Sequence, residues 1–520
     1  MAEPRRSAWS LATPMLLYSC FCLLVGDVLF GYDTASFGGI LANPGFINQF
    51  GTYDPSTQKY AFTSLHTSLL SSLAFIGKFI GCLVAGPAIE WFGHRVVFFG
   101  LSVVSVIGVI IEITSAGTAA GSGRYAQFIV GRIIVYVSVG LVEVDVTTYQ
   151  AEIVPAPFRG LVVVSLQLFL NAGSLVATGV NRAFSTDTSH VGWRSVTGIQ
   201  FIFPILITLF TIFIPSSPRW LLSKGRREEA IAALRRLRPK TAEAESECEA
   251  EVQAIQEALH QHVEKAPWLD LLRGSNLRRT MIVMTTGQAF VSTYQTTFLK
   301  QNGFAAEAFT YPVINTALSF VAVIPAMYLV DKVGRRYSLL TTFLLQAFWI
   351  FLLAGLGEKS NKGPEMLNAI VASFILYWFS YNMGGASIPY LLGGEIPTAA
   401  LREKTQALGT AWNVLWAFGT NFSIPYLISD LHFKIGWVFG SISLLAFIFT
   451  FFFLPETKGR ALEEIDAVFA TPYSPFRKGI PNAERRIGQL EGEVEKGNAV
   501  SDNDGRSVKH AEKSSLEGTR

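Results

Sequence analysis

The sequence predicts an all-α membrane protein with twelve transmembrane helices arranged in two six-helix halves. Half of its 520 residues are hydrophobic and only 16% are charged, whereas soluble domains carry about 25% charged residues. About twelve apolar stretches can each cross a bilayer, because a spanning helix needs about 20 residues with a rise of 1.5 Å each. A charged segment divides these stretches into two sets of six, which indicates two parallel halves with a site between them near the membrane midplane.

The first half is expected at residues 15–214, after a short N-terminal segment of residues 1–14. Its opening span is the mostly apolar run of residues 14–39. This run lacks a small-residue cleavage site, which favours a helix over a signal peptide. The six spans are expected near residues 15–39, 63–85, 96–117, 126–150, 160–181 and 195–214.

A charged linker follows at residues 215–278. One helix is expected to open at Arg227 and another over residues 242–262, where acidic residues recur at helical spacing. The second half is expected at residues 279–454, with spans near 280–300, 309–330, 337–356, 367–392, 404–428 and 434–454. The tail, residues 455–520, is polar, and from about residue 487 its composition is typical of disorder.

Lysine and arginine residues gather on one side of the predicted bilayer. That side holds the N-terminus, the linker, the tail and the loops with Arg95, Arg159 and Arg402, whereas the other side has scattered single residues such as Lys59. Because the side rich in basic residues faces the cytoplasm, both termini of this multi-pass protein are expected to be cytoplasmic.

Each half carries a charged turn after its second span. The first turn contains Glu90, Gly93 and Arg95, and the second contains Asp331, Gly334, Arg335 and Arg336. A glycine turn with an acid before it and arginine after it lets helix ends and neighbouring charges clamp together. One copy would be a weak signal, but two copies at equivalent positions are a strong one.

Further motifs accompany these turns. They are Gly131-Arg132, Glu152 before Arg159-Gly160, residues 215–221 after span six, Glu395 before Leu401-Arg402, and Pro455-Glu456 after span twelve. Together with the turns they resemble the sugar porter family of the major facilitator superfamily, over residues 30–476. Residues 290–294, 381–384 and 401–405 are similar to the fungal maltose and α-glucoside permease branch of that family.

The resemblance implies a transporter that moves a sugar by alternating access, coupled to protons and inward across a fungal plasma membrane. Its partners would be a small-molecule substrate, protons and the lipid bilayer, without nucleic acid or any cofactor. No nucleophile, metal or phosphate motif argues for an enzyme. Two alternatives stay open. One is the transport, even outward, of a polyol, a quinate-like acid or a secondary metabolite. The other is a nutrient sensor that does not transport, although the short tail speaks against it.

The chain departs from the family pattern in two places. In the cytoplasmic motifs of the first half, which the resemblance links to gating, Glu90-Trp91 stands where Asp-Arg is usual. In the same motifs, His94 replaces an arginine and Pro215-Ser216 replaces Pro-Glu. At the sugar site, Val283 and Met284 replace two glutamines of span seven, and Tyr390 replaces the usual tryptophan of span ten. The second set of changes predicts that glucose is a poor substrate and that a disaccharide or a less polar hydroxylated molecule is preferred.

Two ionisable residues lie at matching depths near the outer ends of spans one and four. Asp33 and Arg132 are each about six residues, or about 9 Å, from the outer end of their span. Charged groups inside a membrane are costly and usually functional. The resemblance implies that Asp33 accepts the proton and that Arg132 is its partner; a static ion pair between two helices is the alternative.

The candidate sugar ligands are amides and aromatic residues. By the resemblance, Gln167 and Asn315 contact sugar hydroxyls, and an amide suits this because it both donates and accepts hydrogen bonds. The alternative is hydrogen bonding between helices. Further candidates are Asn382, Asn413 and Trp416, with Phe290, Tyr294 and Tyr390 as rings that can stack on a sugar, although packing is the usual role of such aromatics.

Lys78 is a buried cation that needs a partner. It lies about 22 Å from the outer end of span two, and Glu143 lies at about 25 Å in span four. We therefore predict that Lys78 pairs with Glu143, with Asp145 as the second choice and snorkelling to the inner surface as the alternative. Asp27, six residues before Asp33, faces a different direction and receives no role.

Overall fold

The computed structural model describes residues 13–469, except 56–57, 118, 155, 240–243, 261–266, 286–293, 303, 305–306, 360–362, 399–400, 459–464 and 466–467. The predicted disorder from residue 487 onward therefore lies outside the described residues. Every helix named below belongs to one compact unit, and the few described residues from 465 onward belong to a second.

Each predicted span corresponds to a helix or to a run of helices. In the first half these are α1 (Pro14–Ala42), α3 (Ser64–Ser72) with α4 (Ala74–Phe92), α5 (His94–Thr114), α6 (Tyr125–Ile153), α7 (Ala156–Ala183), and α8 (His190–Gly198) with η2 (Ile199–Phe201) and α9 (Ile202–Thr211). In the second half they are α13 (Gly274–Thr285) and α14 (Gln295–Gln301), α15 (Thr310–Lys332), α16 (Arg335–Gly357), α17 (Pro364–Ser380) with η4 (Tyr381–Gly385) and α18 (Ile388–Glu395), α19 (Arg402–Leu431), and α20 (Ile435–Phe453) after η5 (His432–Lys434).

Eight helical stretches among the described residues are long and apolar enough to cross a membrane by length and composition alone. Helix α6 is not among them, and it carries four charged residues: Arg132, Glu143, Asp145 and Glu152. These four charged residues belong to the sites described below.

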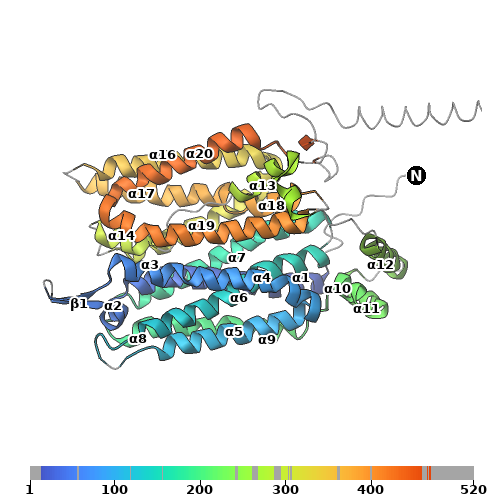
Figure 1. The fold of residues 1–520 in the computed structure, drawn as a ribbon, viewed down its shortest axis with the longest axis horizontal. Helices are drawn as coiled ribbons and strands as arrows, with labels where there is room; N and C mark the ends of the chain where they lie inside the picture. Colours follow the sequence, from blue (N-terminus) through green and yellow to red (C-terminus); the bar gives the residue numbers. More distant parts are fainter. Residues whose placement is uncertain are drawn as a thin grey trace, which may run out of the picture. The chain divides into compact units, whose positions relative to one another are not determined.

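The two ends of the first half are easily told apart (Figure 1). At one end, here called the hairpin end, lie α2 (Pro44–Phe50) and an antiparallel hairpin of β1 (Thr52–Asp54) and β2 (Lys59–Ala61), in which Thr52 pairs with Ala61. At the other, the linker end, lie α10 (Pro218–Ser223), α11 (Arg227–Leu237) and α12 (Ala244–His260), followed in the chain by η3 (Trp268–Leu272). The linker helices start close to where the sequence predicts them, whereas the hairpin was not predicted.

Helix α1 begins and ends at clear sequence signals. Thr13 Oγ1 accepts a hydrogen bond from the backbone of Leu16, and Pro14 occupies the first turn, where its missing N–H is not needed. At the other end Asn43 caps α2 by accepting from the backbone N–H groups of Gly45 and Phe46. The span is thus fixed at both ends, and this fixes the depth of its two aspartates.

Span ten is broken by a π-helical turn at residues 381–385. Gly384 and Gly385 permit this turn and let α16 approach closely, since a Cβ on Gly384 would lie 2.6 Å from Thr342 Oγ1. Pro389 then opens α18 without needing a backbone donor. Such turns are frequent at functional sites, and this one carries Asn382.

The two halves meet at the hairpin end. An aromatic core there combines Phe46, Phe128 and Trp193 of the first half with Phe298 and Phe433 of the second. Hydrogen bonds also cross between the halves: Ser68 Oγ donates to the carbonyl of Phe422 over 2.6 Å, Lys300 Nζ to that of Ala42 over 2.6 Å, and Arg182 Nε to Thr310 Oγ1 over 2.9 Å. These contacts close the hairpin end of the interface.

Candidate functional site

Asp33 is buried in α1 and is bound by an amide. Its Oδ1 accepts a hydrogen bond of 2.9 Å from Gln200 Nε2, in the short 3-10 turn of span six, while its Oδ2 has no partner. Gln200 was not singled out from the sequence. The break between α8 and α9 places its side chain against α1, and only the tertiary structure reveals that approach.

Arg132 is buried beside aromatic rings. Its guanidinium lies 3.6 Å from the centre of the Phe37 ring, and its Nη2 donates to Tyr136 Oη over 3.3 Å. Both Asp33 and Arg132 are described, and no ion pair within 4 Å joins them. The direct contact expected of this pair is therefore absent in this conformation. Phe37 lies one helical turn after Asp33 and covers the guanidinium.

A second carboxylate, Glu112 at the end of α5, belongs to the same cluster. It is 1% exposed, its Oε1 has no hydrogen-bond partner, and it interacts electrostatically with both Arg132 and Asp33. The sequence analysis did not propose Glu112. The sequence signal that could have found it is an acid within the apolar run of residues 109–113, inside the predicted third span.

Three amides join the halves at mid-depth. Asn171 Nδ2 donates to Asn382 Oδ1 over 2.7 Å, and Gln167 Nε2 donates to Asn171 Oδ1 over 3.2 Å. Asn171 also reaches the backbone carbonyl of Ser319 over 3.2 Å. Gln167 and Asn382 were both candidates from the sequence. Asn171, one turn after Gln167, completes the group and was missed.

Asn315 forms a second amide pair, with Gln295 of α14. Asn315 Nδ2 donates to Gln295 Oε1 over 3.1 Å, and both side chains are buried. The other two polar atoms of the pair, Asn315 Oδ1 and Gln295 Nε2, lack partners. The pair thus offers one free acceptor and one free donor, which is the complement of a hydroxyl group.

The aromatic candidates differ in their surroundings. Tyr294 is fully buried, and its hydroxyl donates to the carbonyl of Asn421 over 2.8 Å, which is a structural contact. Trp416 is exposed, and Asn413 on the same helix is half-buried. Phe290 lies outside the described residues. Val283, where the family usually has glutamine, packs against α19, because a Cβ on Gly409 would lie 2.7 Å from Val283 Cγ1.

Lys78 and Glu143 form the ion pair that their depths predict. Lys78 Nζ lies 2.9 Å from Glu143 Oε2, and the two side chains are 6% and 11% exposed. Lys78 also lies 4.7 Å from the centre of the Phe30 ring. Tyr390 of the second half donates to the other oxygen, Glu143 Oε1, over 3.3 Å. This contact ties the buried pair to the opposite half.

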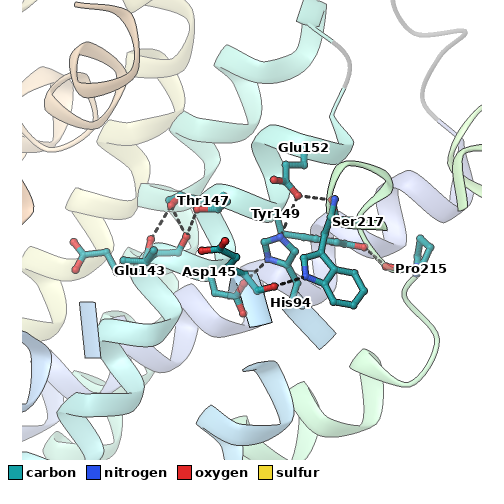
Figure 2. A network of polar contacts seen from close by, with 12 residues as sticks. His94, Glu143, Asp145, Thr147, Tyr149, Glu152, Pro215 and Ser217 are labelled. Carbon is teal, nitrogen blue, oxygen red and sulfur yellow. Dashed lines mark hydrogen bonds and ion pairs between the residues drawn. The ribbon is translucent and has the colours of Figure 1, made fainter. Parts of the chain in front are cut away.

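At the linker end of the first half, His94 bridges two carboxylates (Figure 2). Its Nδ1 lies 2.5 Å from Asp145 Oδ1, and its Nε2 lies 3.1 Å from Glu152 Oε2. Ser217 Oγ donates to Glu152 as well, and Tyr149 Oη donates to the carbonyl of Pro215. The network therefore joins α5 and α6 to the start of the linker.

The second half repeats this arrangement around Arg335. Its Nη2 lies 3.1 Å from Glu395 Oε1, and Thr457 Oγ1 donates to Glu395 Oε2 over 2.9 Å. Glu456 accepts from the backbone N–H groups of Arg335 and Arg336, so that a carboxylate caps the positive end of α16. Gly334 makes this approach possible with a φ of 107°.

The remaining motif residues are placed less completely. Glu90 has an exposed side chain, and its backbone carbonyl accepts from Trp220 Nε1 over 3.1 Å. Arg95 donates to the carbonyl of Ile212 and Arg336 to that of Phe451, each over 2.9 Å. Arg159, Asp331 and Arg402 lie in helices α7, α15 and α19, and their side chains are outside the described part of the structure.

Comparison with known proteins agrees with this architecture. A family model described as sugar (and other) transporter matches residues 19–469. The high-affinity fructose transporter ght6 of Schizosaccharomyces pombe is 30% identical over 488 residues, which cover 90% of each chain. The hexose transporter HXT8 of Saccharomyces cerevisiae is 27% identical and covers 94% of this chain and 88% of that protein.

Solved structures share the fold. The proton:xylose symporter XylE of E. coli has a TM-score of 0.72 and 24% identity, covering 88% of this chain and 99% of that chain. The prediction of a twelve-helix, all-α membrane fold is thereby confirmed. The extent of the family match shows that this chain belongs to the sugar porter family of the major facilitator superfamily and is a membrane transporter rather than an enzyme.

Proposed function

We propose that this protein carries a sugar, or a similar polyhydroxylated solute, inward by alternating access with protons. The observation that carries the proposal is the set of buried amides at mid-depth. Asn171 and Asn382 join the two halves directly, and Asn315 with Gln295 presents a free acceptor and a free donor. A sugar hydroxyl both donates and accepts, so it satisfies the two atoms at once.

Binding at these amides would couple the substrate to the interface between the halves. A hydroxyl that replaces the contact between Asn171 and Asn382 exchanges one hydrogen bond for another and frees the halves to move. Each hydrogen bond is worth about 0.5–1.5 kcal/mol net, so a sugar needs several of them. Together, the buried asparagine and glutamine side chains supply enough donors and acceptors for a ligand with many hydroxyl groups.

Asp33 is the proposed proton acceptor, and Arg132 is its proposed alternating partner. In the present conformation Gln200 binds one carboxylate oxygen while Phe37 covers the guanidinium. A buried carboxylate without a cation favours the protonated form, whereas contact with an arginine favours the charged form. A shift of Phe37 that lets the two groups meet would therefore release the proton.

In the proposed orientation the protein spans the plasma membrane, and its linker end faces the cytoplasm. The basic residues of the linker and of the short loops gather at this end, as the positive-inside rule requires. Both termini would then be cytoplasmic. Inward movement of one proton gains about 2.3 kcal/mol per 100 mV of membrane potential, which is enough to concentrate a neutral solute.

The relatives favour a hexose as the substrate. The two curated relatives named above are described as a fructose and a hexose transporter, whereas the narrower resemblance to α-glucoside permeases favours a disaccharide. The loss of one of the two glutamines carries less weight than expected, because Val283, which stands in its place, packs against α19. The amide pair of Asn315 and Gln295 supplies hydrogen bonds in the same region.

The test is uptake of labelled glucose, fructose, maltose, a polyol and quinate in a transporter-deficient yeast, with and without a protonophore. We expect saturable hexose accumulation that the protonophore abolishes. Asp33→Asn should lose accumulation but keep exchange of labelled for unlabelled sugar, because the amide cannot cycle a proton. Asp430→Asn, at an exposed aspartate of α19, is the matched control. Accumulation by Asp33→Asn at the level of the unmodified protein would refute the role of Asp33.

A further inference from the structure

A second charged cluster lies deeper in the first half than Asp33. Its members are Asp27 on α1, Lys78 on α4, Glu143 on α6 and Tyr390, which reaches in from α18 of the second half. Asp27 precedes Asp33 by six residues, or about 9 Å along the helix and about 240° around it. It therefore faces another part of the half and lies closer to the linker end.

The charges of this cluster do not balance. Lys78 is committed to Glu143 by the 2.9 Å ion pair, so its positive charge is already compensated. Asp27 is 1% exposed, its Oδ2 has no hydrogen-bond partner, and it interacts unfavourably with the negative charge of Glu143. A buried carboxylate without a partner carries a large desolvation penalty, which a bound proton removes.

The described titratable groups around Asp27 leave no other source of compensation. Those that interact with Asp27 itself are Glu143 of α6 and Tyr390 of span ten, and the partners of these two are Lys78 and Cys82 of α4 and Tyr381. Lys78 is the one cation among them, and at neutral pH cysteine and tyrosine are uncharged.

The cluster is also connected to the movement of the halves. Tyr390 belongs to the second half, and its hydroxyl donates to Glu143 Oε1 over 3.3 Å. Tyr390 is 37% exposed, so the contact is not sealed within the core. When the halves separate at this depth, Glu143 loses the donor, and water from the linker side can reach the ion pair.

We propose that Asp27 is a second proton-binding residue of the transport cycle. Asp27 holds a proton while Tyr390 and Lys78 are bound to Glu143. When the Tyr390 contact opens, Lys78 turns from Glu143 to Asp27, water hydrates Glu143, and the Asp27 proton leaves to water on the linker side. The order of events rests on the proposed proton coupling, but the resting protonation of Asp27 does not.

Infrared difference spectroscopy of the purified protein in lipid tests the protonation without any transport. The spectrum of the unmodified protein minus that of Asp27→Asn should contain the carbonyl stretch of a protonated carboxylic acid, shifted in deuterated buffer. The same band should persist in Asp33→Asn. Asp27→Glu retains a carboxyl group and should move the band rather than remove it. Absence of an acid band that depends on Asp27 would overturn the proposal, even if Asp33 proves to be the main coupling residue.

A transport measurement then separates the two protons. In proteoliposomes, the protons imported per sugar should fall in Asp27→Asn, while exchange of labelled sugar continues. If the protein is not coupled to protons at all, sugar transport by the unmodified protein will not depend on the proton gradient, and this outcome would refute the proposed function rather than the protonation of Asp27. A transport rate that depends on a sodium gradient, together with an ionised Asp27, would instead identify a cation site and refute the proton assignment.

Discussion

The ion pair of Lys78 and Glu143 gives the sharpest prediction about stability. Lys78→Met removes the cation and leaves the buried carboxylate of Glu143 without a compensating charge. Breaking a buried ion pair by removing one partner costs about 3–5 kcal/mol. At 1.4 kcal/mol per factor of ten, this lowers the ratio of folded to unfolded protein by about two to three and a half orders of magnitude.

The double variant should recover most of this loss. In Lys78→Met with Glu143→Gln, no charge remains unpaired at position 78 or 143, and the glutamine oxygen still accepts from Tyr390. Glu143→Gln alone should be the milder single change, because Lys78 can then turn to Asp27. The expected order of stability is therefore the unmodified protein, the double variant or Glu143→Gln, and last Lys78→Met.

Fluorescence-detected size exclusion after heating measures the fraction of protein that stays folded and monodisperse. Lys434→Met removes an exposed lysine at the hairpin end and is the matched control for the loss of a positive charge. If the double variant is no more stable than Lys78→Met, the pair does not compensate its two charges, and the reasoning fails. Additive effects of the two single changes would lead to the same conclusion.

Two further predictions concern the gate and the sugar site. Gly334→Ala should impair transport, because Gly334 has a φ of 107° and a Cβ there would lie 2.4 Å from Glu456 Oε2. The control is Gly355→Ala, where a Cβ would meet no atom within 4 Å, and it should leave initial uptake rates unchanged. Gln295→Leu should raise the KM for sugar by about two- to tenfold, the worth of one hydrogen bond, whereas an unchanged KM in a concentration series would exclude Gln295 from the site.

The sequence predicted a contact correctly where depth along the membrane normal alone was enough to choose the partner. Helical rise gives depth along the membrane normal, and the closer match in depth was enough to select Glu143 over Asp145 as the partner of Lys78. The same argument matched the depths of Asp33 and Arg132 but could not foresee that Phe37 covers the guanidinium. Depth does not specify how a helix is rotated or which rotamer a side chain adopts.

The residues that were missed come from breaks in regular structure. Gln200 sits in a 3-10 turn within span six, and Gln295 begins the short helix α14, so neither can be placed by counting along a continuous helix. The hairpin of β1 and β2 has three residues in each strand, which is too short for an alternating pattern to emerge. Asn171 was within reach of the sequence, because it lies one turn from Gln167 on the same face.

The two linker-end networks show what the departures from the family motif do to the gate. In each network a glutamate contacts the first residue of the helix after the charged turn and a hydroxyl group beyond the last span of its half. In the first half Glu152 contacts His94 and Ser217. In the second half Glu395 contacts Arg335 and Thr457. In the second half the cation is an arginine, and its charge does not vary with pH. In the first half a histidine takes that place, and Asp145 supplies the second carboxylate.

This difference makes the gate asymmetric. The first half sets one imidazole against two carboxylates, whereas the second half sets Arg335 and Arg336 near Glu395 and Glu456. A neutral His94 would donate only one hydrogen bond and would leave Asp145 and Glu152 without a cation among their hydrogen-bond partners, so the clamp of the first half weakens when the imidazole loses its charge. The clamp of the second half has no such condition. Of the two networks, the one around His94 is therefore the one whose central cation can lose its charge by giving up a proton.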